Sequence, residues 1–247
     1  MLSLCEELYC ALHFNADDNC LVPLDLNTTN LIVAGGLTAE LFLAGRLRLG
    51  ADQITAVGTT STGDNLLDES LNRLQPVVHF SANDGEWFHA VAQKLSFAQQ
   101  MQARLLTKEV IRPLQKRKWF GLSRSTVYPL QDTAVLQRWQ QLQMDVLVNG
   151  AQPTISDAVL LFMTNAWGTP LPNTFSRQEQ KTADKRWQAL FGDYWGAYPV
   201  EKATDPIPGL DSAAREAIGQ MTISWATLQA SFVAQEATNQ ANIISDI

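Results

Sequence analysis

The sequence has few cysteines and no long uninterrupted apolar run. Cys5, Cys10 and Cys20 are its only cysteines in 247 residues, an odd and small number that fits a reducing compartment without disulfide bonds. No uncharged apolar run approaches the roughly 18 residues that a membrane-spanning helix needs. Glu6 and Glu7 stand where a signal peptide would require apolar residues. These absences predict a soluble, cytoplasmic protein.

Motifs for catalysis and metal binding are missing as well. The three histidines, His13, His79 and His89, stand far apart, and none lies in a Ser-His-Asp or His-Glu-x-x-His context. The strongest zinc alternative is a group of four potential ligands within 16 residues: Cys5, Cys10, His13 and Cys20. Positions 5, 10 and 13 do not share one narrow helical face, and free cysteine is usually buried, which favours packing over zinc. We therefore predict no enzyme activity, no cofactor and no metal.

Positive charge is scarce overall but concentrated in one window. The chain carries −7, which argues against general nucleic-acid binding. Residues 101–140 nevertheless carry +6, because only two acids, Glu109 and Asp132, oppose eight basic residues: Arg104, Lys108, Arg112, Lys116, Arg117, Lys118, Arg124 and Arg138. Four of these recur every four residues from Arg104 to Lys116, although Pro113 is expected to end the helix before Lys116. This asymmetry predicts a basic face on an acidic molecule.

Helical periodicity dominates the rest of the sequence. We expect helices over residues 3–14, 31–44, 87–95, 97–111, 132–148, 155–166, 175–191 and 212–232, with short hairpins near residues 47–57 and 118–128. The pair Gly35-Gly36 costs about 1 kcal/mol per glycine inside a helix, which predicts close approach of a neighbouring helix. The fold class is mainly α: a single-domain helical bundle with short β-hairpins, over residues 1–235, followed by a polar tail at 236–247.

The stretch Thr60–Glu69, TSTGDNLLDE, combines hydroxyls, one glycine and three carboxylates. A phosphate loop would have more glycines and a lysine, and the carboxylates would repel phosphate. Ser61-x-x-Asp64 fits a capping box, and acids in a first helical turn are favoured by the helix dipole. We interpret the stretch as the start of a helix, with surface recognition and catalysis as weaker alternatives.

Three segments together resemble a known family. Residues 2–12 (LSLCEELYCAL), 34–49 (AGGLTAELFLAGRLRL) and 62–71 (TGDNLLDESL) resemble, in order and spacing, the opening helix, the second helix with its following strand, and the Thr-Gly-Asp-x-Leu-Leu-Asp-Glu signature of the Golgi phosphoprotein 3 family. The resemblance is specific over residues 2–74 and looser beyond. A missing long basic N-terminal tail and a short hairpin at Leu47–Val57 are typical of a bacterial-type member.

The resemblance implies a mostly helical, non-enzymatic, peripheral-membrane or adaptor protein, because eukaryotic members bind phosphatidylinositol 4-phosphate and retain glycosyltransferases in the Golgi. The family's lipid pocket uses a tryptophan and three arginines. Here the matching positions hold Asp25, Ala34, Gln99 and Gln102, none of them cationic. Losing two or three charge-assisted phosphate contacts, each worth roughly 1.5–3 kcal/mol, predicts weakened specific recognition of that lipid.

The leading functional hypothesis is association with an anionic membrane surface or phospholipid headgroup through the basic window. Its candidate residues are Arg104, Lys108, Arg112, Lys116, Arg117, Lys118, Trp119 and Arg124. Two alternatives stay open: a solvated charged face without a ligand, and a soluble protein-interaction scaffold that uses aromatics such as Tyr194, Trp195 and Tyr198.

Overall fold

The structure is a computed structural model that describes residues 2–15, 20–22, 26–49, 53–58, 60–74, 80–81, 96–118, 123–131, 133–166 and 175–191. In these ranges the protein is mainly α with small antiparallel sheets, which confirms the expected fold class. The helices predicted at 87–95 and 212–232, the aromatics at 194–198 and the tail at 236–247 lie outside them. Across the described ranges, every helix is too short or too polar to cross a membrane.

The helices and strands follow one another along the chain as the sequence pattern predicts in most places. The helices are α1 (Leu4–His13), α2 (Leu26–Leu43), α3 (Asn65–Leu74), α5 (Ser96–Thr107), α6 (Ala134–Gln143), the π-helix η2 (Met144–Val148), α7 (Ile155–Ala166) and α8 (Arg177–Phe191). The strands are β1 (Phe14–Asn15), β2 (Cys20–Leu21), β3 (Leu47–Leu49), β4 (Gln53–Ala56), β5 (Phe80–Ser81), β6 (Leu114–Lys118) and β7 (Ser123–Pro129). Two antiparallel sheets have the orders β1-β2-β7-β6 and β3-β4-β5.

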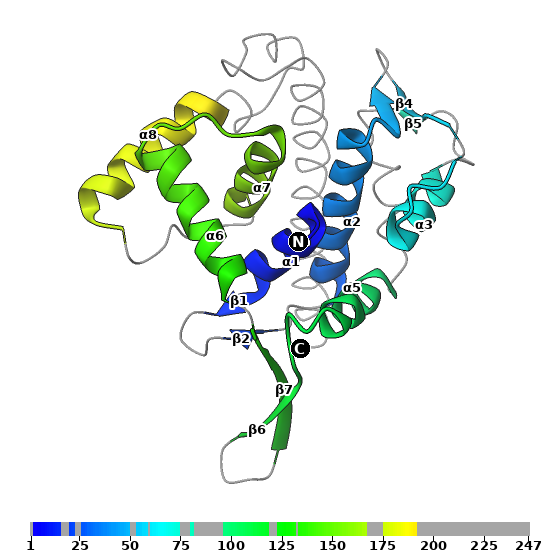
Figure 1. Cartoon of the computed structure of the whole chain (residues 1–247), viewed down its shortest axis with the longest axis horizontal. Coiled ribbons are helices and arrows are strands. Elements are labelled where there is room, and N and C mark those ends of the chain that lie inside the picture. The colour runs from blue at the N-terminus through cyan, green and yellow to red at the C-terminus, as the bar shows by residue number, and fades with distance from the viewer. Residues whose placement is uncertain are drawn as a thin grey trace, which may run out of the picture.

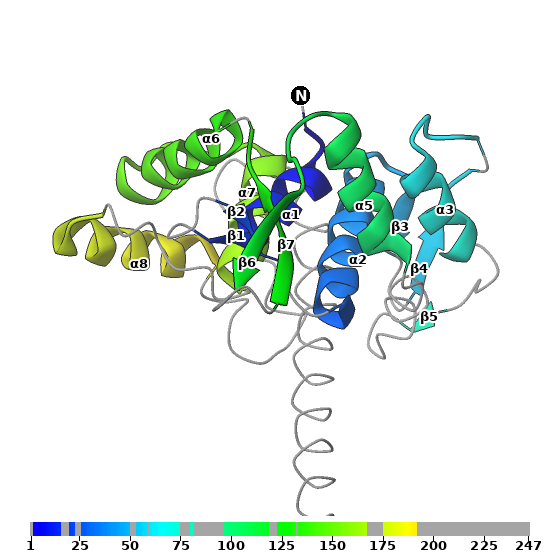
Figure 2. The same ribbon diagram turned by 90° about the horizontal axis from the view of Figure 1, so that it is seen from below.

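Helix α1 is the centre of the molecule. Figure 1 shows α6, α7 and α8 on one side of it and α2, α3 and α5 on the other, and Figure 2 shows the same division from below. Its residues Cys5 and Tyr9 belong to the core shared with α2, α3 and α5. Leu4 and Leu8 belong to a second core shared with α7 and α8. A helix apolar on both sides explains why one short segment joins two layers of helices.

Helices α1 and α2 approach each other closely at Gly36, as the glycine pair predicts. A Cβ atom at Gly36 would lie 2.7 Å from the Sγ of Cys5 and 3.0 Å from its Cα. The Cys5 amide also donates a hydrogen bond to Glu40 Oε1 of α2 (2.7 Å), and its thiol donates to the Val33 carbonyl (3.4 Å). Burial raises the pKa of the Cys5 thiol well above its usual value. Cys5 is therefore a packing residue.

The cysteines and His13 are held without a metal site in the part of the chain that the structure describes. The three cysteines are buried and form no disulfide bond, and the described residues form no group of three or more His, Cys, Asp or Glu side chains suited to a metal ion. His13 Nδ1–H donates to the Tyr9 carbonyl (2.8 Å), and its Nε2 accepts from the Thr29 hydroxyl (3.1 Å). Burial lowers the pKa of His13 to about 4, so the ring is neutral at pH 7.

The stretch Thr60–Glu69 does begin a helix, but its cap differs from the prediction. Helix α3 starts at Asn65, and Asp64 rather than Ser61 is the capping residue. Asp64 Oδ1 accepts hydrogen bonds from the amides of Leu66 (2.8 Å) and Leu67 (3.2 Å). Ser61 instead donates to Asp68 Oδ2 (2.5 Å). Asp64 lies three residues closer to the helix than Ser61, so its carboxylate can accept hydrogen bonds from the free amides of the first turn. Ser61 stabilises the preceding turn instead.

Candidate functional site

The basic window begins with two cations that are bound to a buried acid. Glu6 of α1 has no solvent-exposed surface, and it accepts a hydrogen bond from the Ser3 amide (2.8 Å) in the capping box of α1. Lys108, just after α5, places its Nζ 2.7 Å from Oε1 and 2.8 Å from Oε2 of Glu6. Arg104 Nε lies 3.9 Å from the same Oε1. A buried carboxylate requires such partners, since removing it from water is costly.

Arg104 is held more firmly by the cap of α3. Its Nη1 donates to Asp64 Oδ2 (2.7 Å) and its Nη2 donates to Asp64 Oδ1 (2.8 Å), a two-point pairing of fixed geometry. Burial raises the pKa of Asp64, but hydrogen bonds from Arg104 and from the Leu67 and Leu66 amides outweigh it and lower the pKa below its usual value. The bond to Asp64 likewise raises the pKa of Arg104. We call Glu6, Asp64, Arg104 and Lys108 the ion-pair junction.

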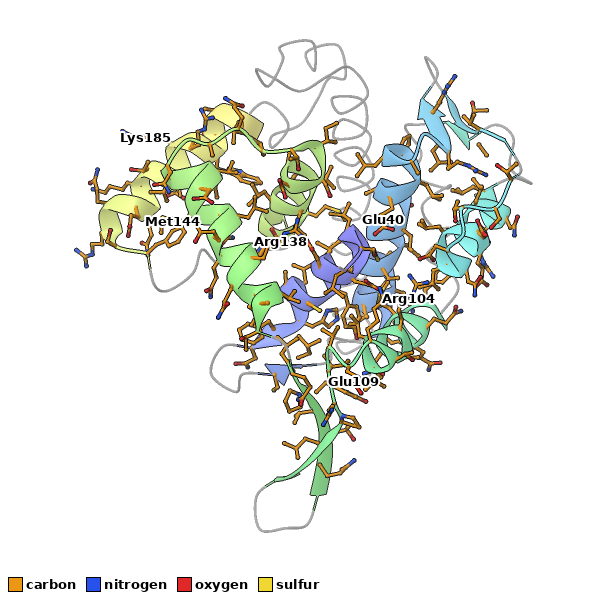
Figure 3. The ribbon with its side chains drawn as sticks, in the orientation of Figure 1. Glu40, Arg104, Glu109, Arg138, Met144 and Lys185 are labelled. Carbon is orange, nitrogen blue, oxygen red and sulfur yellow. The ribbon has the colours of Figure 1, made fainter. Side chains whose placement is uncertain are left out.

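The ion-pair junction corrects one part of the expected basic face. Arg104 and Lys108 face acids of α1 and α3, and Arg104 is only 21% exposed. Arg138 of α6 is bound in the same way, to Glu7 and, at 3.6 Å, to Asp157. Figure 3 labels Arg104 on α5, the helix that packs against α2. These cations join helices and are not presented together to a ligand.

The stripe predicted from Arg104 to Lys116 also ends earlier than expected, because α5 stops at Thr107. Glu109 adopts a left-handed conformation (φ 57°). Its amide donates to the Leu106 carbonyl and the Val110 amide donates to the Leu105 carbonyl, both at 3.0 Å. This left-handed cap ends the helix four residues before the predicted end at Ile111. Arg112 then lies outside the helix, exposed, with its amide bonded to the Pro129 carbonyl (3.3 Å).

The remaining basic residues lie on one projecting hairpin. Strands β6 and β7 extend beyond the helices at the lower edge of Figure 1. Their register pairs Lys116 with Ser125, Arg117 with Arg124 and Lys118 with Ser123. Residues 114–129 contain these four cations and no acid. We call this segment the basic hairpin; Trp119, the aromatic candidate, lies outside the described residues.

β6 and β7 are longer than the predicted strands, and β6 begins before the predicted hairpin. The pairing starts at Leu114 with Val127, although prediction placed the first strand at Lys118–Phe120. The sequence Leu-Gln-Lys-Arg-Lys has too few β-branched or aromatic residues to predict a strand. It becomes one because β7 pairs with it at all five residues, and β2 extends the sheet by pairing with β7 at the next two residues, Tyr128 and Pro129.

The positions that match the family's lipid pocket carry no positive charge in the described structure. Ala34 of α2 is fully buried in the core. Gln99 of α5 is exposed and Gln102 is half-buried. Asp25 lies outside the described residues. Helices α2 and α5 pack together, so these neutral positions lie on adjoining elements.

Sequence reasoning missed the acids of the ion-pair junction. Lys108 and Glu6 are separated by 102 residues, and Arg104 and Asp64 by 40, so no local spacing predicts either pair. The only local signals were the Ser3-x-x-Glu6 capping box and the Asp64 turn, which indicate helix starts. Both acids therefore serve a helix start and a distant cation at once.

Comparison with known proteins bears on the whole arrangement. A search of curated proteins finds no match to this chain. The family model for Golgi phosphoprotein 3 (GPP34) matches residues 4–207. That range includes α1 with the ion-pair junction, the basic hairpin and α8. The match confirms the resemblance seen in the three segments, and this chain belongs to the Golgi phosphoprotein 3 (GPP34) family.

Proposed function

We propose that this protein is a non-enzymatic, peripheral membrane protein that associates with anionic lipid surfaces through the basic hairpin. The observation that carries the proposal is the contrast within the basic window. Arg104, Lys108 and Arg138 are paired with acids, whereas the four cations of the basic hairpin stand on a projecting element that has no acid of its own.

The expected binding energy is modest and depends on salt. A basic residue near an anionic bilayer contributes about 1 kcal/mol, and this attraction falls off over a Debye length of about 10 Å at 0.1 M salt. Arg112, exposed at the base of the hairpin, adds a fifth cation. The other surfaces of this acidic chain would be repelled by the same bilayer, so the hairpin would approach the membrane first.

Recognition would follow surface charge and not the identity of one headgroup. The pocket positions Ala34, Gln99 and Gln102 supply neither arginine nor lysine, and a phosphomonoester carries about −1.5 to −2. Binding to phosphatidylinositol 4-phosphate above that to other lipids of equal total charge is therefore not expected. The adaptor role, with an unidentified protein partner, is the family-level part of this proposal.

The test is co-sedimentation of the full chain with vesicles of phosphatidylcholine alone, with phosphatidylglycerol, and with phosphatidylinositol 4-phosphate at matched surface charge. We expect binding to both anionic vesicles at low salt, loss at high salt, and none to the neutral vesicle. The variant Lys116→Gln/Arg117→Gln/Lys118→Gln removes three hairpin cations. Its matched control is Arg177→Gln/Lys181→Gln/Lys185→Gln, which removes three exposed cations from α8.

The two variants separate the hairpin from net charge. Both change the charge of the chain by the same amount, but Figure 3 shows Lys185 on the far side of the molecule from Glu109, where the chain enters the hairpin. Only the hairpin variant should lose vesicle binding. Equal losses in both variants would assign binding to overall charge, and no binding by the unchanged protein at low salt would leave the soluble scaffold as the better function.

A further inference from the structure

The side chain of Asn149 lies next to a backbone amide that can react with it, that of Gly150. Asn149-Gly150 is the only Asn-Gly dipeptide in the sequence, and it directly follows the π-helix η2. The amide nitrogen after an asparagine can attack the side-chain carbonyl carbon, and glycine shields that nitrogen least because it has no Cβ. The rate of this attack therefore depends on the solvent exposure of the turn and on the hydrogen bonds that restrain it.

The turn is open on the side where the reaction occurs. Asn149 and Gly150 are both exposed, and no heavy atom lies within 4 Å of the Cβ position of Gly150, whose φ is +76°. The neighbouring amides are bonded, Asn149 to the Met144 carbonyl (2.9 Å) and Ala151 to the Asp145 carbonyl (2.8 Å). Among the described residues, none accepts a hydrogen bond from the Gly150 amide. The attacking nitrogen is therefore the unbonded one of the three.

Two features restrain the closed turn. Asn149 Nδ2 donates a long hydrogen bond to Asp145 Oδ1 (3.3 Å), near the weak limit for this geometry. The ψ angle of Asn149 is −10°, and closing a five-membered ring requires rotation away from this near-helical value. Ring closure therefore needs the release of one weak hydrogen bond and one backbone rotation. Both occur at an exposed helix end, where local opening costs little free energy.

We propose that Asn149 is a site of spontaneous deamidation, with water as the co-reactant. The Gly150 amide nitrogen, on losing its proton, bonds to Cγ of Asn149, and the side-chain amide leaves as ammonia. Water then opens the resulting succinimide at either carbonyl, which gives aspartate or isoaspartate. Asparagine and water are consumed, one ammonia is released, and nothing is oxidised or reduced.

The product would disturb the packing of η2. A carboxylate at position 149 cannot donate to Asp145, and it places two negative charges one helical turn apart at a helix C-terminus, where anions are unfavourable. Within η2, Val146 and Leu147 are buried in the same core cluster as Trp187 and Leu190 of α8. The modification should therefore loosen the contact between η2 and α8.

The experiment incubates the full native chain in neutral and mildly alkaline buffer and follows both asparagines by peptide mass spectrometry. Asn65, exposed and followed by Leu66, is the internal control. We expect amide loss at Asn149, faster at the higher pH, and none at Asn65 over the same period. Asn149→Gln should abolish the modification, because its ring would be six-membered.

A second measurement tests the structural consequence. Hydrogen exchange at Met144–Val148 should quicken in the aged protein and in Asn149→Asp, and stay unchanged in Asn149→Gln. Conversion in the denatured chain but none in the native chain would overturn the proposal, because the folded turn would then be closed to the reaction. The mass measurement stands even where Asn149→Asp folds poorly, because it uses the unchanged protein.

Discussion

The two halves of the basic window differ in what surrounds their cations. In the helical half, Arg104 and Lys108 meet Asp64 and the fully buried Glu6. In the hairpin half, four cations occupy a segment without any acid. The difference teaches that charge density along a sequence does not measure the charge available to a partner. Cations opposite buried acids stabilise the fold, and the proposed lipid contact therefore depends on the cations of the segment that contains no acid.

The largest expected effect comes from breaking the ion-pair junction at its buried end. Glu6→Gln removes the acid shared by Lys108 and Arg104 and should lower the free energy of unfolding by about 3 kcal/mol, the low end for a broken buried pair. Lys108→Gln should cost less, because the Lys108 side chain is 42% exposed and its loss leaves Arg104 beside Glu6. Urea unfolding measures both, and equal losses would contradict the asymmetry.

His13 of α1 should contribute strongly to the pH dependence of stability, and the basic hairpin should contribute nothing to it. His13 has a folded pKa of about 4 against an ordinary 6.5, so the unfolded state binds the proton more readily between these values. The free energy of unfolding therefore falls as pH drops from 6.5 to 4, by up to about 3 kcal/mol from this group.

The comparison that isolates His13 is His13→Asn. Burial raises the pKa of Glu7 and Glu40, and raised carboxyl pKa values oppose the His13 slope, so only the difference between the two proteins is informative. Unfolding curves across this pH range should be flatter for the variant. The hairpin variant, which has lost no histidine or carboxylate, should keep the original slope.

Asp64 sharpens the comparison because its two roles can be separated. Asp64→Asn keeps a good capping side chain but removes the charge opposite Arg104, and it should cost about 2 kcal/mol. Asp64→Ala removes the cap as well and should cost about 1 kcal/mol more. Its folded pKa is depressed, so its contribution is present above the unfolded pKa and lost as pH falls through the folded one. If Asp64→Asn and Asp64→Ala had the same free energy of unfolding, the cap would contribute nothing.

Glu109 lies where the ion-pair junction ends and the hairpin approach begins, and it carries a left-handed φ that glycine tolerates better. Glu109→Gly should raise the free energy of unfolding by about 1 kcal/mol. Gly45, with φ +66°, occupies the same position after α2. Gly45→Ala should therefore destabilise by a similar amount, and thermal unfolding of the two variants should shift in opposite directions.

The smallest effect on stability should come from the basic hairpin itself. Lys116→Gln/Arg117→Gln/Lys118→Gln should change the free energy of unfolding by less than about 0.5 kcal/mol, because the basic hairpin contains no acid of its own and charges on an edge strand contribute little. Its vesicle binding should nevertheless fall. If the hairpin variant lost as much free energy of unfolding as Glu6→Gln, the proposed difference between the two halves of the basic window would be wrong.

Particular residues show how far the sequence predicts the fold. Helix α7 was predicted at its observed bounds, Ile155–Ala166, since an apolar periodic run of that length has few alternatives. The early end of α5 was not predicted, because Glu109 is not a residue that indicates a left-handed cap. Strand β6 was placed late, because its lysines and arginine pair only on account of the neighbouring strand.

What the sequence alone determined is the family, the mainly α fold class and the existence of a basic window, because these depend on local periodicity and on residue types in order. Only the tertiary structure decided that Arg104, Lys108 and Arg138 of that window are paired with acids. Glu6 and Asp64 are distant from Lys108 and Arg104 along the chain, and a carboxylate selects its partner by distance in space. Because the packing of α1 buries Glu6, its carboxylate needs a cationic partner to offset the loss of water.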